Sequence, residues 1–197
     1  MMSNISMVSS NQVAAARLRV MPSVEDDRRG ITDILLDSGI FNRSDAECVD
    51  GMFGEAFTRP GDDNYRFLSC WEDGAWPGAF DERATGHDLV RDGSRLAGFA
   101  CYGREALTQG TWDLFWVCVS STARRKGAGR ALLAEVLRRA QQERVRLVVI
   151  YTSSTDKYAP ARRLYESMGF ERTAIVPDYY AGNDDLYIYT QRLASKE

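Results

Sequence analysis

Apolar residues recur along the chain with two spacings, which predict an alternation of strands and helices. Apolar and β-branched runs predict strands over 17–21, 65–71, 96–102, 111–119, 146–151, 173–176 and 186–193. Between them, apolar residues three to four positions apart predict amphipathic helices that begin near Ser23, Ser44, Gly129 and Pro160. Neither a repeat nor a linker interrupts this order. The pattern therefore predicts one mixed α+β domain from residue 16 to residue 197, after a polar, disordered segment over 1–15.

One strand-to-helix junction concentrates basic residues and glycines. The apolar run 114–119 leads into a short loop with three basic residues, 124–126, and then into Gly127-Ala128-Gly129 at the start of a helix. The first amides of a helix have no intrahelical acceptor, and the helix dipole is positive there. Glycine lets the backbone approach an anion, and Arg130 adds charge. The junction predicts a phosphate or pyrophosphate site, although a tight turn also explains the glycines taken alone.

Two motifs in order resemble the GCN5-related N-acetyltransferase (GNAT) superfamily. The first is Arg124-x-x-Gly127-x-Gly129 after a strand, and the second is Leu164-Tyr165-Glu166-x-x-Gly169-Phe170. The P-loop and dinucleotide fingerprints are absent from the sequence. The resemblance covers residues 96–193. It implies a mixed α/β GNAT fold, in which a mostly antiparallel, twisted sheet of six to seven strands is flanked by about four helices. It also implies acetyl-CoA as co-substrate, without a metal.

The resemblance assigns a set of cofactor-binding residues. The loop that would bind the pyrophosphate of acetyl-CoA consists of Arg124, Arg125, Lys126, Gly127, Ala128, Gly129 and Arg130. The backbone of Val117, Cys118 and Val119 would bind the pantetheine arm and supply an amide to the oxyanion of the reaction. Tyr158 stands where relatives often carry an asparagine that contacts the pantetheine arm.

The resemblance also suggests a general acid, whereas the general base stays open. Tyr165 matches a tyrosine that in many relatives protonates the leaving thiolate. Some relatives carry a glutamate at the end of the strand that here reads 149–153, and this chain has Tyr151 or Ser153 there. The remaining candidates for the base are Asp113, at the head of the strand that leads to the glycine loop, and Asp156, Asp184 and Asp185. Each of these acids also fits a cap or a solvated turn.

Tyrosines mark a candidate acceptor site. Tyr151, Tyr179 and Tyr180 are expected to line it, although half-buried strand tyrosines explain them equally well. The segment 175–180 is similar to acetyltransferases of ribosomal protein N-termini and to small-molecule acetyltransferases. Residues 72–91 have little periodicity and predict an inserted surface loop, in which Trp76 and Phe80 either line the acceptor site or pin the loop.

Three functions follow from the resemblance. The first is an acetyl-CoA-dependent N-acetyltransferase that acts on a small-molecule amine through direct attack in a ternary complex. The second is a protein N-terminal or lysine acetyltransferase. The third is a non-catalytic acyl-CoA-binding sensor, which the missing glutamate favours and Tyr165 opposes.

Composition and charge argue against nucleic acid, metal ions and membranes as partners. The net charge of −3 and the pI of about 5.4 argue against nucleic acid as a partner, since the basic cluster at 124–130 is local. Cys48, Cys70, Cys101 and Cys118 are scattered without metal-ligand spacing, and His87 is the one histidine, so we expect no metal. No signal peptide or apolar run of membrane-spanning length is present. We therefore expect a cytoplasmic monomer or homodimer with no membrane partner.

Overall fold

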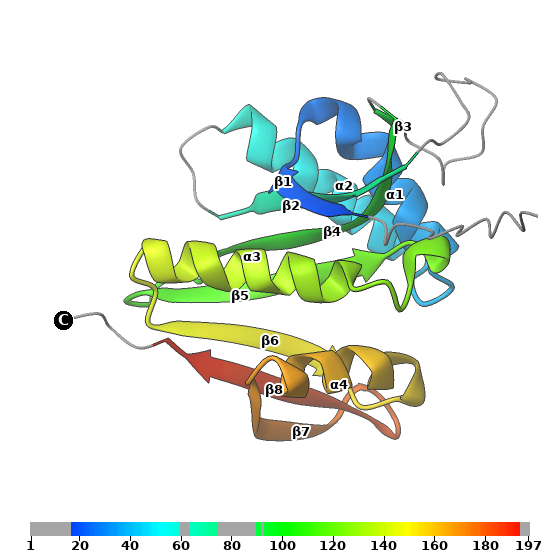
Figure 1. The fold of residues 1–197 in the computed structure, drawn as a ribbon. Helices are drawn as coiled ribbons and strands as arrows, with labels where there is room; N and C mark the ends of the chain where they lie inside the picture. The colour runs from blue at the N-terminus through cyan, green and yellow to red at the C-terminus, as the bar shows by residue number, and fades with distance from the viewer. Residues whose placement is uncertain (1–16, 60–63, 75–89, 92, 194–197) are drawn as a thin grey trace, which may run out of the picture.

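A computed structural model describes residues 17–59, 64–74, 90–91 and 93–193, which form one sheet with helices on both faces (Figure 1). The strands lie in the order β1-β2-β4-β5-β6-β8-β7, and β3 pairs with β4 outside this path. Every pair is antiparallel except β5 with β6. The strands are β1 (Leu18–Pro22), β2 (Arg66–Asp73), β3 (Val90–Arg91), β4 (Ser94–Arg104), β5 (Thr111–Val119), β6 (Leu147–Ser153), β7 (Glu171–Ala181) and β8 (Asp184–Arg192). The helices are α1 (Arg28–Asp37), α2 (Arg43–Thr58), α3 (Ala128–Gln142) and α4 (Ala159–Ser167), with 3₁₀ turns η1 (Glu25–Asp27), η2 (Ser121–Ala123) and η3 (Asp156–Tyr158).

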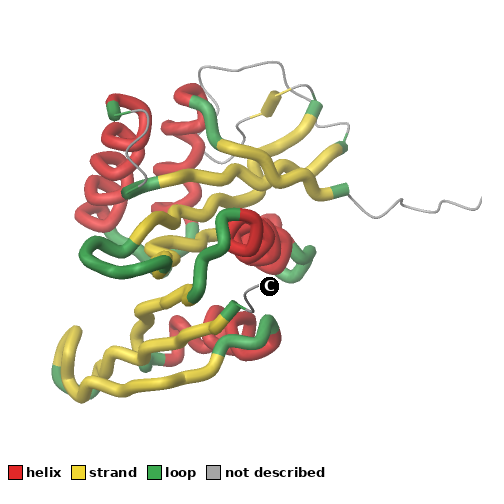
Figure 2. Tube along the Cα trace, turned by 90° about the vertical axis from the view of Figure 1, so that its left-hand side faces the viewer, coloured by secondary structure: helices red, strands yellow, loops and turns green. Residues whose placement is uncertain are grey.

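Two apolar clusters hold the helices against opposite faces of the sheet (Figure 2). The first contains Leu132, Leu133 and Val136 of α3 together with Tyr165 of α4, and it covers what we call the α3/α4 face. The second contains side chains of α1 and α2, and it covers the α1/α2 face. Because strand side chains alternate between faces, these clusters also tell which way each strand residue points.

The neighbouring strands β5 and β6 pair only at their beginnings and then separate (Figure 1). Thr111–Asp113 pairs with Leu147–Val149, and no later pair joins the two strands. A β-bulge follows on β5, because Leu114 pairs with Tyr102 and Trp116 with Cys101, which leaves Phe115 as an extra residue. A bulge bends its strand, so it helps β5 to leave β6. We call this region the β5–β6 divergence.

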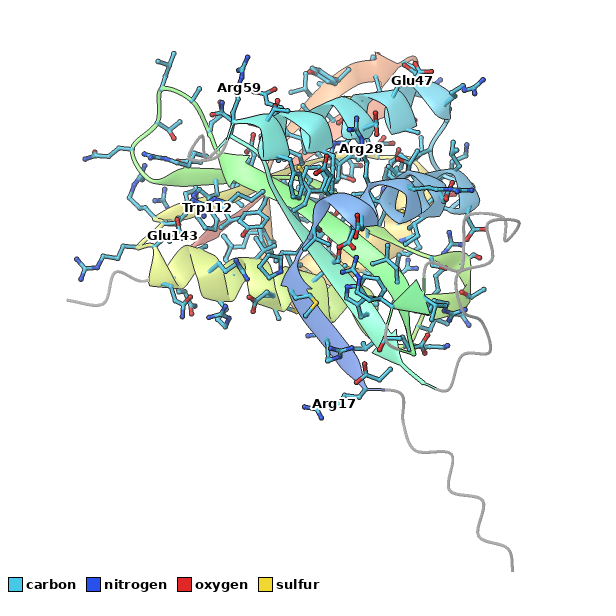
Figure 3. The ribbon with its side chains drawn as sticks, turned by 90° about the horizontal axis from the view of Figure 1, so that it is seen from above. Arg17, Arg28, Glu47, Arg59, Trp112 and Glu143 are labelled. Carbon is cyan, nitrogen blue, oxygen red and sulfur yellow. The ribbon has the colours of Figure 1, made fainter. Side chains whose placement is uncertain are left out.

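Polar contacts fix the helices at several points (Figure 3). Arg28, at the start of α1, donates from Nε to Asp50 Oδ1 of α2 over 2.6 Å. Near the end of α3, Arg66 of β2 donates to Glu143 over 2.6 Å, and its guanidinium lies over the ring of Trp112, 5.2 Å from the centroid. Within the described residues, no helix is both long and apolar enough to cross a membrane.

The predicted elements are present, and the mixed fold is confirmed, but two helix starts were assigned wrongly. The Ser23 hydroxyl bonds to Ser69 Oγ over 2.8 Å instead of capping a helix, and α1 begins only at Arg28, after η1. The cap of α2 is Asn42 rather than Ser44, because its side-chain oxygen accepts from the Ser44 and Asp45 amides.

The sequence predicts two irregular segments, 1–15 and 72–91. The segment 1–15, which was predicted to be disordered, lies outside the described residues, as do 75–89 of the expected loop over 72–91, with Trp76 and Phe80. The first residues of that loop, Glu72 and Asp73, belong to β2, and its last two form β3, so the loop is shorter at both ends than predicted.

Candidate active site

The glycine loop at the start of α3 has a backbone suited to an anion. Arg125 and Gly127 both have a left-handed backbone, with φ of 63° and 93°. Ala131 is the first residue of the helix to donate back, to the Gly127 carbonyl over 2.9 Å. The amides between them have no intrahelical acceptor, and they lie at the positive end of the α3 dipole. Successive free amides at such a turn form a concave anion site.

Gly129 lies in a closely packed part of this loop. A Cβ atom there would lie 3.2 Å from Leu164 Cδ2 of α4 and 3.6 Å from Val119 Cγ2 of β5. The start of α3 therefore sits directly against β5 and α4, beside the β5–β6 divergence. The loop fits the pyrophosphate of acetyl-CoA, since its backbone is close to the diverging strands and carries no bulky side chain at this point.

Most basic side chains of the loop are held by other parts of the protein. Arg124 donates to the Ser38 carbonyl at the end of α1 over 2.5 Å. Lys126 Nζ donates to Glu72 Oε1 over 2.8 Å. Arg130 donates to Ser167 Oγ over 2.8 Å and to Met168 Sδ over 3.0 Å, at the end of α4.

Arg125 differs from these three cations. Its side chain is exposed and makes no hydrogen bond or ion pair with the described residues. The other three side chains fix the position of the loop. Arg125 is the one whose guanidinium is available to an anionic ligand.

Glu72 lies behind the loop as a buried carboxylate, with a side chain only 1% exposed. Arg95 Nη2 donates to its Oε2 over 2.8 Å, and Lys126 donates to its other oxygen. Burial opposes ionisation of Glu72, but the hydrogen bonds from Lys126 and Arg95 outweigh it and lower the pKa of the carboxyl. The loop is thus tied to β2 and β4 through an ionised group.

The backbone of β5 beyond the bulge faces the divergence on one side. Val117, Cys118 and Val119 pair with Ala100, Phe99 and Gly98 of β4, but they have no partner on β6. Val117 and Val119 are partly exposed, whereas 111–114 are buried. The predicted pantetheine segment therefore has one free edge, as amide contacts to a bound ligand require.

Asp113 is the last residue of β5 that pairs with β6, so it lies where the two strands part. Its side chain is buried, with the residue 5% exposed, and Oδ1 has no hydrogen-bond partner among the described residues. Trp112 and Leu114 belong to the α3/α4 cluster, so Asp113 points to the α1/α2 face. Burial, followed by the neighbouring Glu105 carboxylate, raises its pKa to about 7.

Glu105 was missed in the sequence. It follows β4, and its amide donates to the Thr111 carbonyl over 2.9 Å, which continues the β4–β5 hairpin by one step. Gly103 pairs with Asp113, so Glu105 lies diagonally across from Asp113 on the same face. Extending the predicted hairpin past residue 102 could have found it, because the register alone brings the two carboxyls together.

Tyr165 lies on the opposite side of the divergence from Asp113. It belongs to the α3/α4 cluster and packs against Phe170 and Tyr189, with ring centroids 6.3 and 5.8 Å away. Burial raises the pKa of its phenol, and Tyr158, Tyr189 and Cys118 raise it further. The phenol therefore stays protonated at neutral pH.

The predicted acceptor tyrosines share one neighbourhood with Tyr158. Burial raises the pKa of Tyr151, with further contributions from Asp113, Glu105 and Tyr179. Burial also raises the pKa of Tyr180 to about 12, with contributions from Tyr179, Tyr158 and Asp184. Tyr179 and Tyr180 are in β7 itself rather than in its connection to β8, and their rings are 5.0 Å apart.

Aromatic residues from the α1–α2 connection complete this neighbourhood. Phe41 lies 5.2 Å from the ring of Trp116 on β5 and 6.2 Å from the ring of Tyr158. Neither Phe41 nor Trp116 was singled out from the sequence, because no local pattern shows that the α1–α2 connection reaches the divergence.

The other candidates for the base have structural partners or lie in the open. Asp184 accepts from Ser153 Oγ over 2.5 Å, and Asp185 accepts from the Asp178 amide over 3.0 Å. Asp156 is exposed in η3. Among the described residues, no three His, Cys, Asp or Glu side chains are grouped so that they could hold a metal ion.

Comparisons with known proteins agree with this geometry. The family model "Acetyltransferase (GNAT) family" matches residues 50–170, more than half of the chain. A GNAT-family protein from Desulfovibrio desulfuricans has a similar structure, with a TM-score of 0.75 and 28% identity over 90% of this chain and 100% of the other.

Two further structures are similar in fold. They are the ribosomal-protein-S18-alanine N-acetyltransferase of Escherichia coli (TM-score 0.65, 20% identity, 92% of this chain and 98% of the other) and a Salmonella typhimurium structure with its cofactor acetyl-CoA (TM-score 0.64, 19% identity, 90% and 94%). No curated protein matches the chain. The matched family model and these structures show that the chain belongs to the GNAT family of acetyltransferases, whose acyl donor is acetyl-CoA.

Proposed function

We propose that the protein transfers an acetyl group from acetyl-CoA to the primary amine of a small molecule, by direct attack within a ternary complex. The observation that carries this proposal is Asp113. It is a buried carboxyl with a pKa of about 7, and it lies where β5 and β6 part. A carboxyl whose pKa is near the working pH is suited to general base catalysis.

The donor side is supported by the loop and the free edge of β5. Acetyl-CoA supplies an acetyl thioester that is reactive towards amines. The amides from Arg125 to Arg130 and the Arg125 guanidinium bind its pyrophosphate, and the backbone of 117–119 binds its pantetheine arm. Tyr158, at the N-terminus of α4, lies near Cys118, so it adds to the binding site for the pantetheine arm.

The two proton-transfer groups flank the divergence from opposite faces. Asp113, on the α1/α2 face, accepts the proton that the ammonium must lose before its nitrogen attacks. Tyr165, on the α3/α4 face, gives its proton to the departing thiolate. Because burial makes this phenol a weaker acid than an ordinary tyrosine, we assign it the smaller contribution to rate. An amide within 117–119 stabilises the oxyanion.

A protein N-terminus is the second candidate acceptor. All residues of β7 are exposed. Within the described part of the chain this strand pairs only with β8, so its outer edge is available to an extended peptide. The small-molecule acceptor is favoured by the ring contacts of Phe41 with Trp116 and Tyr158, which bring aromatic surface from three elements to one place. A non-catalytic binding module has no need of a buried carboxyl with a pKa near 7.

Release of free coenzyme A from acetyl-CoA tests the proposal. We expect turnover with small primary amines that exceeds turnover with short peptides, and loss of that turnover in Asp113→Asn. Higher turnover with peptides would move the function to the second candidate. Binding of acetyl-CoA without turnover of any amine or peptide would leave the sensor function.

A further inference from the structure

We infer that the acceptor is a small amine whose ammonium is its only charge, and that a carboxylate beside the amine causes rejection. This inference rests on the proposed function and names its substrate class. Its basis is the distribution of charged side chains between the two faces of the sheet at the divergence, which the strand register determines.

The register puts two carboxyls and a tyrosine on three neighbouring strands. Asp113 on β5 is opposite Gly103 of β4 and Val149 of β6. Two residues along each of these strands, on the same face, stand Glu105, toward the paired end of β5 and β6, and Tyr151, toward the open end of the divergence. Tyr151 is exposed, with an exposed fraction of 48%. The acidic pair therefore lies beside an accessible tyrosine ring, and Asp113 Oδ1 has no hydrogen-bond partner among the residues that the structure describes.

Three neighbouring arginines point to the opposite face, and a fourth lies farther from Asp113. Arg162 and Arg172 lie over the ring of Tyr187, which packs on the α3/α4 cluster. Arg104 is opposite Trp112, so it points to that face too. Arg192 does share the α1/α2 face, in the same row as Glu105, but it stands on β8, two strands away from Asp113, whereas Glu105 follows the strand next to Asp113.

The electrostatic surroundings of the tyrosines agree with this distribution. Besides burial, the charged side chains that raise the pKa of Tyr151 are Asp113 and Glu105, and those that raise the pKa of Tyr158 are Asp45 and Asp184. An ammonium is stabilised by such carboxylates and by the faces of tyrosine rings. A carboxylate one carbon away from that ammonium would be repelled by the same carboxylates and ring faces.

Three matched amines test this inference. Phenethylamine and phenylalanine differ by one carboxylate, and phenylalaninamide fills the space of that carboxylate without its charge. We expect kcat/KM for phenethylamine and phenylalaninamide to exceed that for phenylalanine by about 30-fold or more, the effect of one like-charge contact in a partly buried site. Equal values for phenethylamine and phenylalanine would overturn the inference. Rejection of the amide together with the acid would overturn it too, because size would then be the cause.

A variant and its control locate the effect. Glu105→Gln should reduce the ratio of kcat/KM between phenethylamine and phenylalanine by about 5-fold or more, since one repelling charge is gone. Any change in the strength of the base cancels in this ratio. Glu47→Gln makes the same change on the exposed surface of α2 and should leave the ratio unaltered (Figure 3). An unaltered ratio in Glu105→Gln would remove Glu105 from acceptor selection.

Binding separates this inference from the proposed function. Calorimetry of the three amines with the coenzyme A-bound protein needs no turnover. Selective binding of phenethylamine and phenylalaninamide without any acetylation would uphold the acceptor class and end the proposed activity. Acetylation of all three amines at similar rates would uphold the activity and end the inference.

Discussion

Two buried carboxyl groups of this protein stand in opposite electrostatic settings. Glu72, behind the glycine loop, is bonded to Arg95 and Lys126, and its pKa is lowered. Asp113, at the β5–β6 divergence, faces Glu105 instead of a cation, and its pKa is raised to about 7. Both side chains are almost fully buried. Burial therefore does not decide whether such a group is charged; the neighbours that the fold provides decide it.

The difference separates a structural role from a chemical one. A carboxylate that two cations hold ionised keeps its charge across the physiological range and fixes the position of the loop. A carboxyl that is half ionised near neutral pH can take up and release a proton. The cost of its charged form is the cost of a group that can transfer protons.

The largest effect is expected from Glu72→Gln. It removes a buried charge that is bonded to both Arg95 and Lys126, so the free energy of unfolding should fall by about 3–5 kcal/mol. Urea denaturation at pH 7 measures this change. Because the pKa of Glu72 is lower in the folded protein than in the unfolded chain, its stabilisation is present above about pH 4.3 and is lost as pH falls through the folded pKa. The gap to the wild type should thus shrink in acid.

The matched control for this change is Glu143→Gln, which breaks the surface pair with Arg66 and should cost less than about 1 kcal/mol. A similar small loss in Glu72→Gln would show that Glu72 is not an anchor of the loop.

Asp113→Asn should have the reverse effect on stability and a large effect on rate. Turnover should fall by about 10²–10⁴-fold, the usual contribution of a general base. In the wild type, the unfolded chain releases this proton at about pH 3.9 and the folded protein at about 7, so stability falls between these values and stays lower above them. At pH 8 the variant should therefore be more stable than the wild type by about 1–3 kcal/mol and should melt at a higher temperature. At pH 4 the two proteins should melt at the same temperature.

A melt of Asp113→Asn at pH 8 that is lower than that of the wild type would mean that the carboxylate is stabilised rather than strained. In that case Asp113 and Glu72 would be alike, and the contrast between them would fail.

Arg125→Ala and Lys126→Ala should separate ligand contact from anchoring within one loop. Arg125→Ala removes a charge-assisted contact to the pyrophosphate, so Kd for coenzyme A should rise by about 10–100-fold with the melting temperature unchanged. Lys126→Ala removes one of the two partners of Glu72, so it should lower the melting temperature and raise Kd less. Calorimetry measures Kd for coenzyme A and thermal melts measure stability on both variants. A larger rise in Kd for Lys126→Ala, with a lower melting temperature for Arg125→Ala, would make Lys126 the ligand contact and Arg125 the anchor.

Tyr165→Phe should have the smallest effect. The ring keeps its contacts with Phe170 and Tyr189, and only the proton is lost. Because the phenol is a weak acid in this setting and thiolates leave tolerably well, we expect turnover to fall by about 10-fold or less, with the same Kd for acetyl-CoA. Steady-state kinetics measure the fall, and an unchanged turnover number where chemistry limits the rate would assign Tyr165 to packing alone.

The sequence predicts what depends on neighbouring residues along the chain. Strand and helix positions follow from apolar spacing, and the glycine loop follows from Gly127 and Gly129 at a strand-to-helix junction. The directions of the loop side chains could not be predicted, because the partners of Lys126 and Arg124 are 54 and 86 residues away. A distant partner also explains Ser23. Its hydroxyl is hydrogen-bonded to Ser69, 46 residues away, and so does not cap a helix.

Asp113 shows the limit most clearly within the site. Its position on a strand was predicted, but its partner depends on the register of the hairpin, in which the Phe115 bulge and the bond from Glu105 to Thr111 fix which face each residue takes. A single-residue change of register would have sent the carboxyl to the α3/α4 face.

The burial of the cysteines has a practical consequence for detecting the product. Cys70, Cys101 and Cys118 are buried, and burial raises the pKa of Cys70 and Cys118 to about 12, so thiol reagents react with them slowly. Cys48 is the exposed one among the four cysteines. A colorimetric reagent for sulfhydryls therefore meets one reactive thiol on each folded chain. Coenzyme A released during the reaction is then counted above a constant background of one equivalent per enzyme molecule.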